Sequence, residues 1–324
     1  MSSIKFNNVY INNYYSIAGP MEKVGQIRKF DATLDDYYFG ERTFELAEIK
    51  MQKTVVENLL YREKCTTMEI DCIIGGDLTN QIATSSYTAR KFKIPNLGIY
   101  SACATFAEAL IISANFIDSK KMKKVIAITS SHNLVAEKQF RFPVEYGAPK
   151  KKTSTFTATG SVGALVTGVA SNIKIESATI GMTVDLECKD ANHLGAAMAP
   201  AAADTIKRHL TDLKRDINYY DIILTGDLGN IGSKILREYL EINYNIKLKK
   251  HVDAGEQIFA QSQNVKSGAS GPVSLPLVLF NKVLRNTKLK KILIVGTGAL
   301  HSPSLLNQKD TIPAIAHAVS LEVL

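Results

Sequence analysis

Three segments from the first half of the chain recur in the same order in its second half. "DCIIGGDL" at 71–78 resembles "DIILTGDL" at 221–228, and "KKVIAITSSH" at 123–132 resembles "KKILIVGTGALHS" at 290–302. Between these matches, "SACATFAEAL" at 101–110 resembles "SGASGPVSLPL" at 267–277. One match would carry little weight, because buried parallel strands all read as runs of Val, Ile and Leu. Three matches in one order predict an internal duplication.

Apolar strand-like runs alternate with helix-like segments, which is typical of an α/β protein. The periodicity predicts helices at 42–61, 103–118, 196–213, 232–243 and 272–285. Each half is expected to end in a further strand, at 155–168 and at 314–324.

Parallel strands joined by helices must be covered on both faces, so we expect the two halves to share one helical layer. The most apolar helix of each half, starting near Cys103 and near Ser270, would form that layer. We place the halves at 1–180 and 181–324.

Composition narrows the function classes. The four cysteines are too few and too irregularly spaced for a disulfide framework or a zinc site, and no metal site is expected. We expect neither a secretory signal nor a membrane-spanning helix. The net charge of +8 is concentrated in short basic runs at 120–124, 150–152, 247–250 and 288–291. These runs favour anionic small molecules or an acidic membrane surface over nucleic acid, for which no motif is found.

Cys103 lies where a predicted strand gives way to a buried helix. A helix N-terminus lowers the pKa of a thiol and holds anions, so this position suits a nucleophile or a binding pocket. A buried cysteine can also be an inert core residue. A reactive thiol needs a base, and His132 and His301 both follow predicted strands, at the ends where ligands of α/β sheets gather.

The duplicated halves, with a cysteine opening the first central helix, resemble the thiolase superfamily of condensing enzymes. In that superfamily the cysteine is acylated, and the β-ketoacyl synthase III branch supplies a histidine and an asparagine from the second half. Here Asp227 stands where the histidine is expected, and Ala269 or a near neighbour stands where the asparagine is expected. A carboxylate disfavours a thiolate and alanine has no donor for an oxyanion, so we do not expect condensation chemistry.

A closer similarity covers nearly the whole chain. The segments at 130–147, 198–210, 221–232 and 312–322, above all "AEKQFRFPVEYG" and "APAAADT", resemble the family of stage V sporulation protein AD. This resemblance implies a five-layer αβαβα thiolase-like fold made of two pseudo-duplicated halves with mixed sheets. It also implies a protein that is not an enzyme, binds dipicolinic acid (pyridine-2,6-dicarboxylate) and assists its uptake into the developing spore.

The same resemblance implies partners and a location. The expected partners are the other SpoVA channel proteins, and the expected location is the forespore or spore inner membrane, through peripheral contact. By analogy with the superfamily, we also expect a homodimer formed through the sheet edge of the first half. No cofactor is expected, although calcium could accompany the ligand.

A flat dianion calls for a helix N-terminus, cations and an aromatic wall. The candidate ligand-binding residues are Cys103, His132, Lys138, Arg141, Phe142, Asp77 and Asp227, with Phe140 as a second wall. Lys138 and Arg141 could instead be surface charges or form a structural salt bridge, and the two aspartates could be caps of the helices that follow them. The alternative function is an acyl-CoA-dependent acyltransferase or condensing enzyme with Cys103 as nucleophile and His132 as base.

Overall fold

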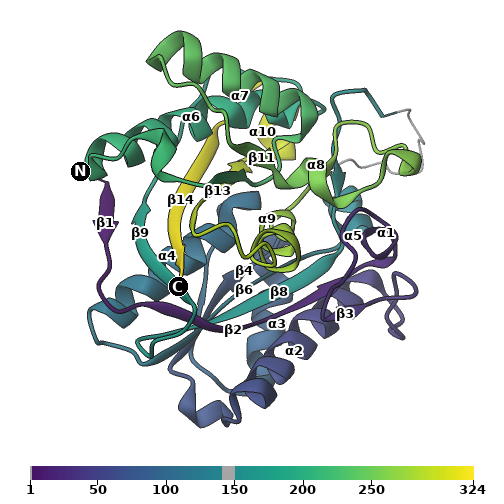
Figure 1. Ribbon diagram of the computed structural model, residues 1–324. Coiled ribbons are helices and arrows are strands. Elements are labelled where there is room, and N and C mark those ends of the chain that lie inside the picture. Colours follow the sequence, from purple (N-terminus) through teal and green to yellow (C-terminus); the bar gives the residue numbers. More distant parts are fainter. Residues whose placement is uncertain (1, 141–149) are drawn as a thin grey trace.

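In this computed structural model, which describes residues 2–140 and 150–324, each half of the chain contributes five strands to the main path of one large mixed sheet, and two short strands pair beside this path (Figure 1). Those of the first half are β2 (Tyr10–Ala18), β4 (Cys72–Gly76), β5 (Asn96–Gly98), β6 (Lys124–Ser131) and β8 (Gly160–Thr167). Those of the second half are β9 (Ile173–Thr179), β10 (Ile222–Thr225), β11 (His251–Asp253), β13 (Lys291–Ala299) and β14 (Ala314–Val323).

The two sets of strands have the same order and the same directions. The order is β5-β4-β6-β8-β2 in the first half and β11-β10-β13-β14-β9 in the second. In each set the first three strands are parallel neighbours, and the last two pair antiparallel. The three sequence matches fall on β4 and β10, on the two central helices, and on β6 and β13. The predicted duplication is therefore confirmed.

The halves are joined where β2 meets β9, through the pairs Tyr10 with Lys174 and Ile11 with Ile173. Strand β9 otherwise pairs with β14, so it is the first strand of the second half. By strand pairing, the halves meet before Ile173, and the expected boundary at 180 falls after this strand rather than before it.

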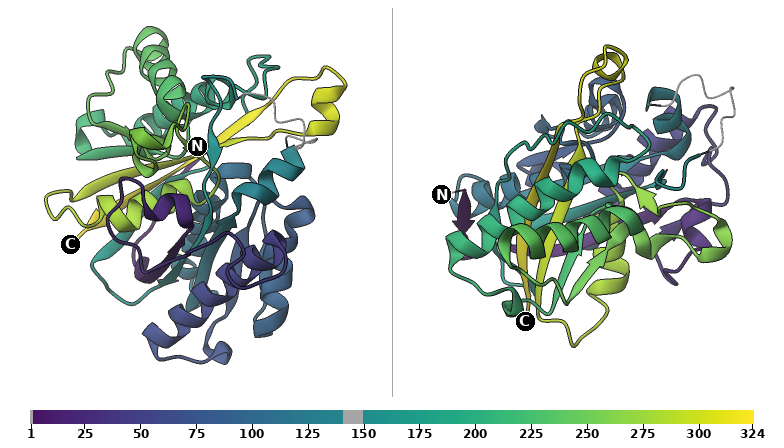
Figure 2. Two further views of the ribbon diagram at one scale, coloured as in Figure 1. Left: turned by 90° about the vertical axis from the view of Figure 1, so that its right-hand side faces the viewer. Right: turned by 90° about the horizontal axis from the view of Figure 1, so that it is seen from above.

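Helices divide the molecule into five layers (Figures 1 and 2). The outer helices are α2 (Phe44–Glu63) and α3 (Ala83–Phe92) on the first sheet, and α6 (Leu194–Leu213) and α7 (Gly229–Tyr244) on the second. The middle layer consists of α4 (Thr105–Asp118) and α9 (Ser274–Val278), which continues as a π-helical turn, Leu279–Val283. Helix α4 contacts strands of both half-sheets. The expected αβαβα arrangement with a shared helical layer is confirmed.

Local sequence explains the ends and the packing of these helices. The Thr43 hydroxyl caps α2 by accepting a hydrogen bond from the Leu46 amide at 3.3 Å. In the middle layer, Phe106 of α4 meets Phe280 edge to face, and Phe280 stacks on Tyr14 of β2 with ring centroids 4.3 Å apart. Each fully buried side chain of this size contributes roughly 1.5–3 kcal/mol to the stability of the fold.

Shorter elements connect these layers. They are β1 (Ser3–Lys5), α1 (Pro20–Lys23), β3 (Ala32–Thr33), α5 (Asn133–Phe140), β7 (Phe156–Thr157), α8 (Ala254–Ile258), β12 (Ala269–Ser270) and α10 (Pro303–Asn307). Single 3₁₀ turns span Thr67–Glu69, Asn80–Ile82, Ala102–Ala104, Ile217–Tyr219 and Gln261–Gln263. Among the helices of residues 2–140 and 150–324, none is both long and apolar enough to cross a membrane.

Candidate functional site

Cys103 lies in the 3₁₀ turn that opens α4, between the two halves. Ala102, just before it, has a φ of +50°, in the left-handed region that disfavours residues with a side chain. Strand β13 approaches this turn so closely that a Cβ on Gly298 would lie 2.2 Å from the Ser101 carbonyl oxygen. A Cβ on Gly296 would lie 2.7 Å from that of Ala107. Only glycine permits this approach, and it holds Cys103 against the second half.

The thiol of Cys103 lies close to the carboxyl group of Asp227, which follows β10. Asp227 is itself held in place, because one oxygen accepts from the Gly271 amide at 3.0 Å and the other from the Thr297 hydroxyl at 2.8 Å. The Gly271 amide also points toward the sulfur of Cys103. The thiol of Cys103, in the first half, is therefore surrounded by two residues of the second half, Asp227 and Gly271.

This environment disfavours a thiolate. Burial raises the pKa of Cys103 well above its usual range, and the negative charge of Asp227 raises it further. Burial also raises the pKa of Asp227, to about 6, although its hydrogen bonds oppose the rise. A second buried carboxyl, Asp253, has a pKa raised by burial to about 7. Cys103 is therefore a protonated thiol at neutral pH, unlike an activated nucleophile.

The groups that a condensing enzyme would place here are different in kind. A carboxyl group meets the thiol where an imidazole would take its proton. Ala269, in β12, is fully buried, and its methyl group cannot donate a hydrogen bond.

His132 lies on the opposite face of β6 from Cys103. Successive residues of a strand point to opposite faces, and Ile126 and Ile128 pack in the core cluster under α2. His132 follows this register: its Nε2 bonds the Tyr37 carbonyl oxygen at 2.8 Å, and its ring stacks on Phe44 at 5.2 Å. Burial lowers the pKa of His132. The structure does not bring His132 to Cys103, because the strand turns it toward α2.

Lys138 and Asp77 have structural partners. Lys138, on α5, pairs with Glu45 of α2 at 2.8 Å, on the same side as His132. Asp77 is fully buried after β4. One of its oxygens accepts from the amide and hydroxyl of Thr79, and the other from the amide and hydroxyl of Ser85, at 2.8 and 2.7 Å. Lys138 therefore forms a structural salt bridge, and Asp77 caps the helix that follows it. Arg141 and Phe142 lie outside the described residues.

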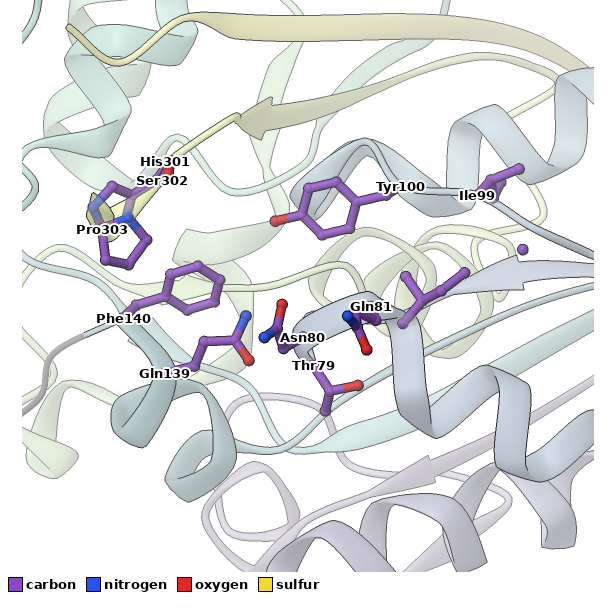
Figure 3. A pocket seen from close by; sticks show the side chains of 12 residues that line it. Thr79, Asn80, Gln81, Ile99, Tyr100, Gln139, Phe140, His301, Ser302 and Pro303 are labelled. Carbon is purple, nitrogen blue, oxygen red and sulfur yellow. The ribbon is translucent and has the colours of Figure 1, made fainter. Parts of the chain in front are cut away.

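A pocket of about 410 Å³ opens at the carboxyl ends of β4, β5 and β13 (Figure 3). Its lining residues are Thr79, Asn80, Gln81, Ile82, Gly98, Ile99, Tyr100, Gln139, Phe140, His301, Ser302 and Pro303. Phe140 and His301, both noted from the sequence, lie with ring centroids 5.6 Å apart at one end.

Tyr100 connects this pocket to Cys103. Its hydroxyl points into the cavity, opposite the carboxamides of Asn80 and Gln81 (Figure 3). Burial, together with the nearby groups of Cys103 and Asp77, raises the pKa of Tyr100 to about 12. The sequence interpretation does not single out Asn80, Gln81, Tyr100 or Gln139. The rule that ligands gather at the carboxyl ends of parallel strands identifies the first three, which follow β4 and β5.

Two half-sheets with one strand order, a shared helical layer and a cysteine at the start of one central helix define a thiolase-like fold. The crystal structure of cerulenin-bound OleA from Xanthomonas campestris superimposes with a TM-score of 0.64 at 14% identity, over 98% of this chain and 99% of that one. 3-Oxoacyl-[acyl-carrier-protein] synthase III from Aquifex aeolicus gives a TM-score of 0.54 at 16% identity, over 99% of both chains. Identities this low support the fold alone.

Sequence similarity then defines the family. The model of the stage V sporulation protein AD (SpoVAD) family matches residues 2–322. Stage V sporulation protein AD of Bacillus subtilis strain 168 is 41% identical over 318 residues, 97% of this chain and 94% of the relative. The chain belongs to the SpoVAD family of sporulation proteins.

Proposed function

We propose that this protein is a non-catalytic binding protein that takes dipicolinic acid into the pocket beside Cys103 and assists its uptake into the developing spore. The observation that carries the proposal is the Cys103–Asp227 pair. A thiol held protonated by a buried carboxyl keeps the position of a condensing nucleophile but not its reactivity. Membership of a sporulation family supplies the biological setting.

The pocket suits a small, flat, oxygen-rich ligand. Its volume of about 410 Å³ is that of a site for a small molecule, and it combines the aromatic rings of Phe140 and Tyr100 with several polar side chains. Pyridine-2,6-dicarboxylate offers one ring to stack and two carboxylates to accept hydrogen bonds. Calcium would enter with the ligand rather than through Asp77, whose oxygens already accept hydrogen bonds from Thr79 and Ser85.

The exposed edge of the first half-sheet supports a homodimer. Among the strands of residues 2–140 and 150–324, β5 pairs only with β4, and all three of its residues are exposed. Leu97 in this strand and Tyr87 on the neighbouring helix α3 are exposed apolar groups. An unpaired edge of this kind is a template for pairing with another strand. We propose that a second copy of the chain covers it.

The remaining partners follow from charge and family. We propose peripheral contact with the spore inner membrane and with the SpoVA channel proteins, favoured by the basic runs that give the chain its net charge of +8.

Calorimetry with dipicolinate, with and without calcium, tests the function. The wild-type protein should bind, and His301→Ala and Phe140→Ala should weaken binding because these residues close one end of the pocket. Lys249→Ala, in a separate pocket between the ends of α6 and α7, is the matched control and should bind as the wild type does. Arg141→Ala tests the sequence prediction for that residue. A folded wild-type protein that does not bind with or without calcium would refute the proposal.

The position of Cys103 on a strained turn keeps the acyltransferase alternative testable. Incubation with acyl-coenzyme A followed by mass spectrometry should leave Cys103 unmodified. A covalent acyl adduct on this residue would favour the enzyme instead.

A further inference from the structure

Four hydrogen-bonding side chains face the pocket without a partner among the described residues. They are the carboxamides of Asn80, Gln81 and Gln139 and the hydroxyl of Tyr100. They come from three separate segments: the turn after β4, the link between β5 and the Cys103 turn, and α5. The other polar group on this wall, Thr79, already donates its hydroxyl hydrogen to Asp77.

These four groups share one chemical property. Each carboxamide can donate two hydrogen bonds and the tyrosine hydroxyl one, whereas an ionised carboxylate can only accept. Figure 3 shows Tyr100 on one side of the cavity and the carboxamides of Asn80, Gln81 and Gln139 on the other. Donors on two facing walls match a ligand that carries acceptors at both ends.

The turn that holds Asn80 and Gln81 is strained. Gln81 has a φ of +60° and Ile82 a φ of +48°, so two consecutive residues with side chains are left-handed. For a β-branched residue such as isoleucine this conformation is a genuine outlier, and such strain persists only where the surroundings impose it.

Two contacts hold the strained turn in place. Asp77 binds Thr79 before the turn and Ser85 after it, through the hydrogen bonds described above. On the other side, the Ile82 side chain packs onto Gly98 of β5, where an added Cβ would lie 2.3 Å from Ile82 Cδ1. The buried carboxylate and the edge strand therefore hold the backbone of the turn that carries Asn80 and Gln81.

We propose that the Asn80–Ile82 turn is a preformed specificity clamp, which selects small ligands with two carboxylates by holding carboxamide donors opposite Tyr100. This inference rests on the proposed function, since it assigns ligand selection at the same pocket. Asn80 and Gln81 contact one carboxylate and Tyr100 the other. Gln139 borders the same space from α5.

The test compares binding of dipicolinate with that of pyridine-2-carboxylate, which has one carboxylate, by calorimetry on the full chain. Gln81→Gly removes the carboxamide and relieves the left-handed strain. Its affinity for dipicolinate should fall roughly tenfold or more, as expected for a lost hydrogen bond to a charged group. Its preference for dipicolinate over the monocarboxylate should shrink. Tyr100→Phe should reduce the same preference, whereas Gln81→Asn, which keeps a carboxamide and tolerates the left-handed region, should retain part of it.

Lys214→Gly is the matched control, because Lys214 is also left-handed, with a φ of +54°, but ends α6 away from this pocket. It should bind both ligands as the wild type does. Thermal melting confirms that each variant is folded. Unchanged affinity and unchanged preference in a folded Gln81→Gly protein would overturn the clamp while leaving the binding function intact.

A wild-type protein that does not bind dipicolinate would refute the proposed function. The clamp can then be tested separately with other carboxylates. Melting temperatures are measured with benzene-1,3-dicarboxylate, benzene-1,4-dicarboxylate and citrate. At least one of these three compounds should raise the melting temperature of the wild type but not that of Gln81→Gly. If none of these stabilises the wild type, or if any does so equally in both proteins, the clamp is wrong as well.

Discussion

The carboxyl group of Asp227 lies against the thiol of Cys103, although the two residues belong to different halves of a duplicated chain. The contact exists because β13 packs onto the Cys103 turn through Gly296 and Gly298. A histidine at this position would accept the thiol proton and stabilise the thiolate. A buried carboxylate instead disfavours the thiolate, because its negative charge raises the pKa of the thiol.

Asp227→Asn should make Cys103 more reactive. Removing the negative charge lowers the pKa of the thiol relative to the wild type, although burial still keeps it raised. Alkylation of Cys103 by iodoacetamide at mildly alkaline pH should accelerate roughly tenfold, since one pKa unit changes the thiolate fraction tenfold. Mass spectrometry of the Cys103 peptide measures the rate, with the partly exposed Cys188 as internal reference. Equal rates in both proteins would contradict the role given to Asp227.

Glu22 should make the fold less stable as pH rises. It is fully buried in α1, and burial raises its pKa from 4.5 to about 7. Between these values the folded state holds a proton that the unfolded state has lost, so the free energy of unfolding falls as pH rises through this range and levels off above it. Glu22→Gln should therefore match the wild type near pH 4 and exceed it at pH 8, by on the order of 3 kcal/mol.

The substitution is nearly isosteric. One Glu22 oxygen accepts from the Thr159 amide at 2.9 Å, and the other has no partner among the described residues, so a carboxamide keeps the existing bond. Urea unfolding at the two pH values measures the effect, and the exposed Glu187→Gln serves as control. A pH-independent difference between Glu22→Gln and the wild type would show that the charge of Glu22 is not the cause.

Much of the fold is predictable because buried parallel strands and apolar helices leave strong patterns. Strands β4, β6, β10 and β13 and both central helices are recognisable from their repeats. Strand β2, in contrast, carries Asn12 and Asn13 among tyrosines, and α3 reads "ATSSYTARKF", so neither shows a clear apolar period. These two elements acquire their structure from pairing and from packing on neighbours rather than from local pattern.

The site is less predictable, because its geometry depends on which face of each strand meets which layer. His132 follows a strand that ends near the site, but the alternation of side chains along that strand turns it toward α2, and the sequence does not reveal which face α4 covers. The position of Asp227 is easier to predict, since this residue follows a repeated strand. The pocket side chains Asn80, Tyr100 and Gln139 come together only in three dimensions, and none belongs to a periodic motif.

Gly298→Ala should destabilise the Cys103 turn. The added Cβ would lie 2.2 Å from the Ser101 carbonyl oxygen, a backbone atom that cannot move without shifting the turn. Overpacking of this kind costs about 1–3 kcal/mol of stability or more, and ligand binding should weaken as the turn shifts. Gly168→Ala is the control, because its Cβ would have no neighbour closer than 3.5 Å. Thermal unfolding of both variants measures the effect. Similar melting temperatures would refute the close approach of Gly298 to the Ser101 carbonyl oxygen.

The basic runs should produce salt-sensitive binding to anionic vesicles. Lys120, Lys121 and Lys123 are exposed in the loop before β6. Co-sedimentation with phosphatidylglycerol vesicles should decline as ionic strength rises, because salt screens exposed charges beyond about 10 Å at 0.1 M. Changing these three lysines to glutamate should weaken binding further, and phosphatidylcholine vesicles provide the uncharged control. Binding that is indifferent to salt would argue against electrostatic docking.

Leu97→Lys should dissociate the proposed homodimer. Leu97 is the central residue of edge strand β5 and is 42% exposed in the single chain. Lysine on an edge strand opposes strand pairing, because two copies meeting at this edge would bring like charges together without solvation. Sedimentation velocity should show a dimer for the wild type and a monomer for the variant at the same concentration. Met68→Lys is the matched control, since Met68 is 95% exposed and lies away from this edge, in the turn Thr67–Glu69. A dimer that survives Leu97→Lys, or a monomeric wild type, would remove β5 as the interface.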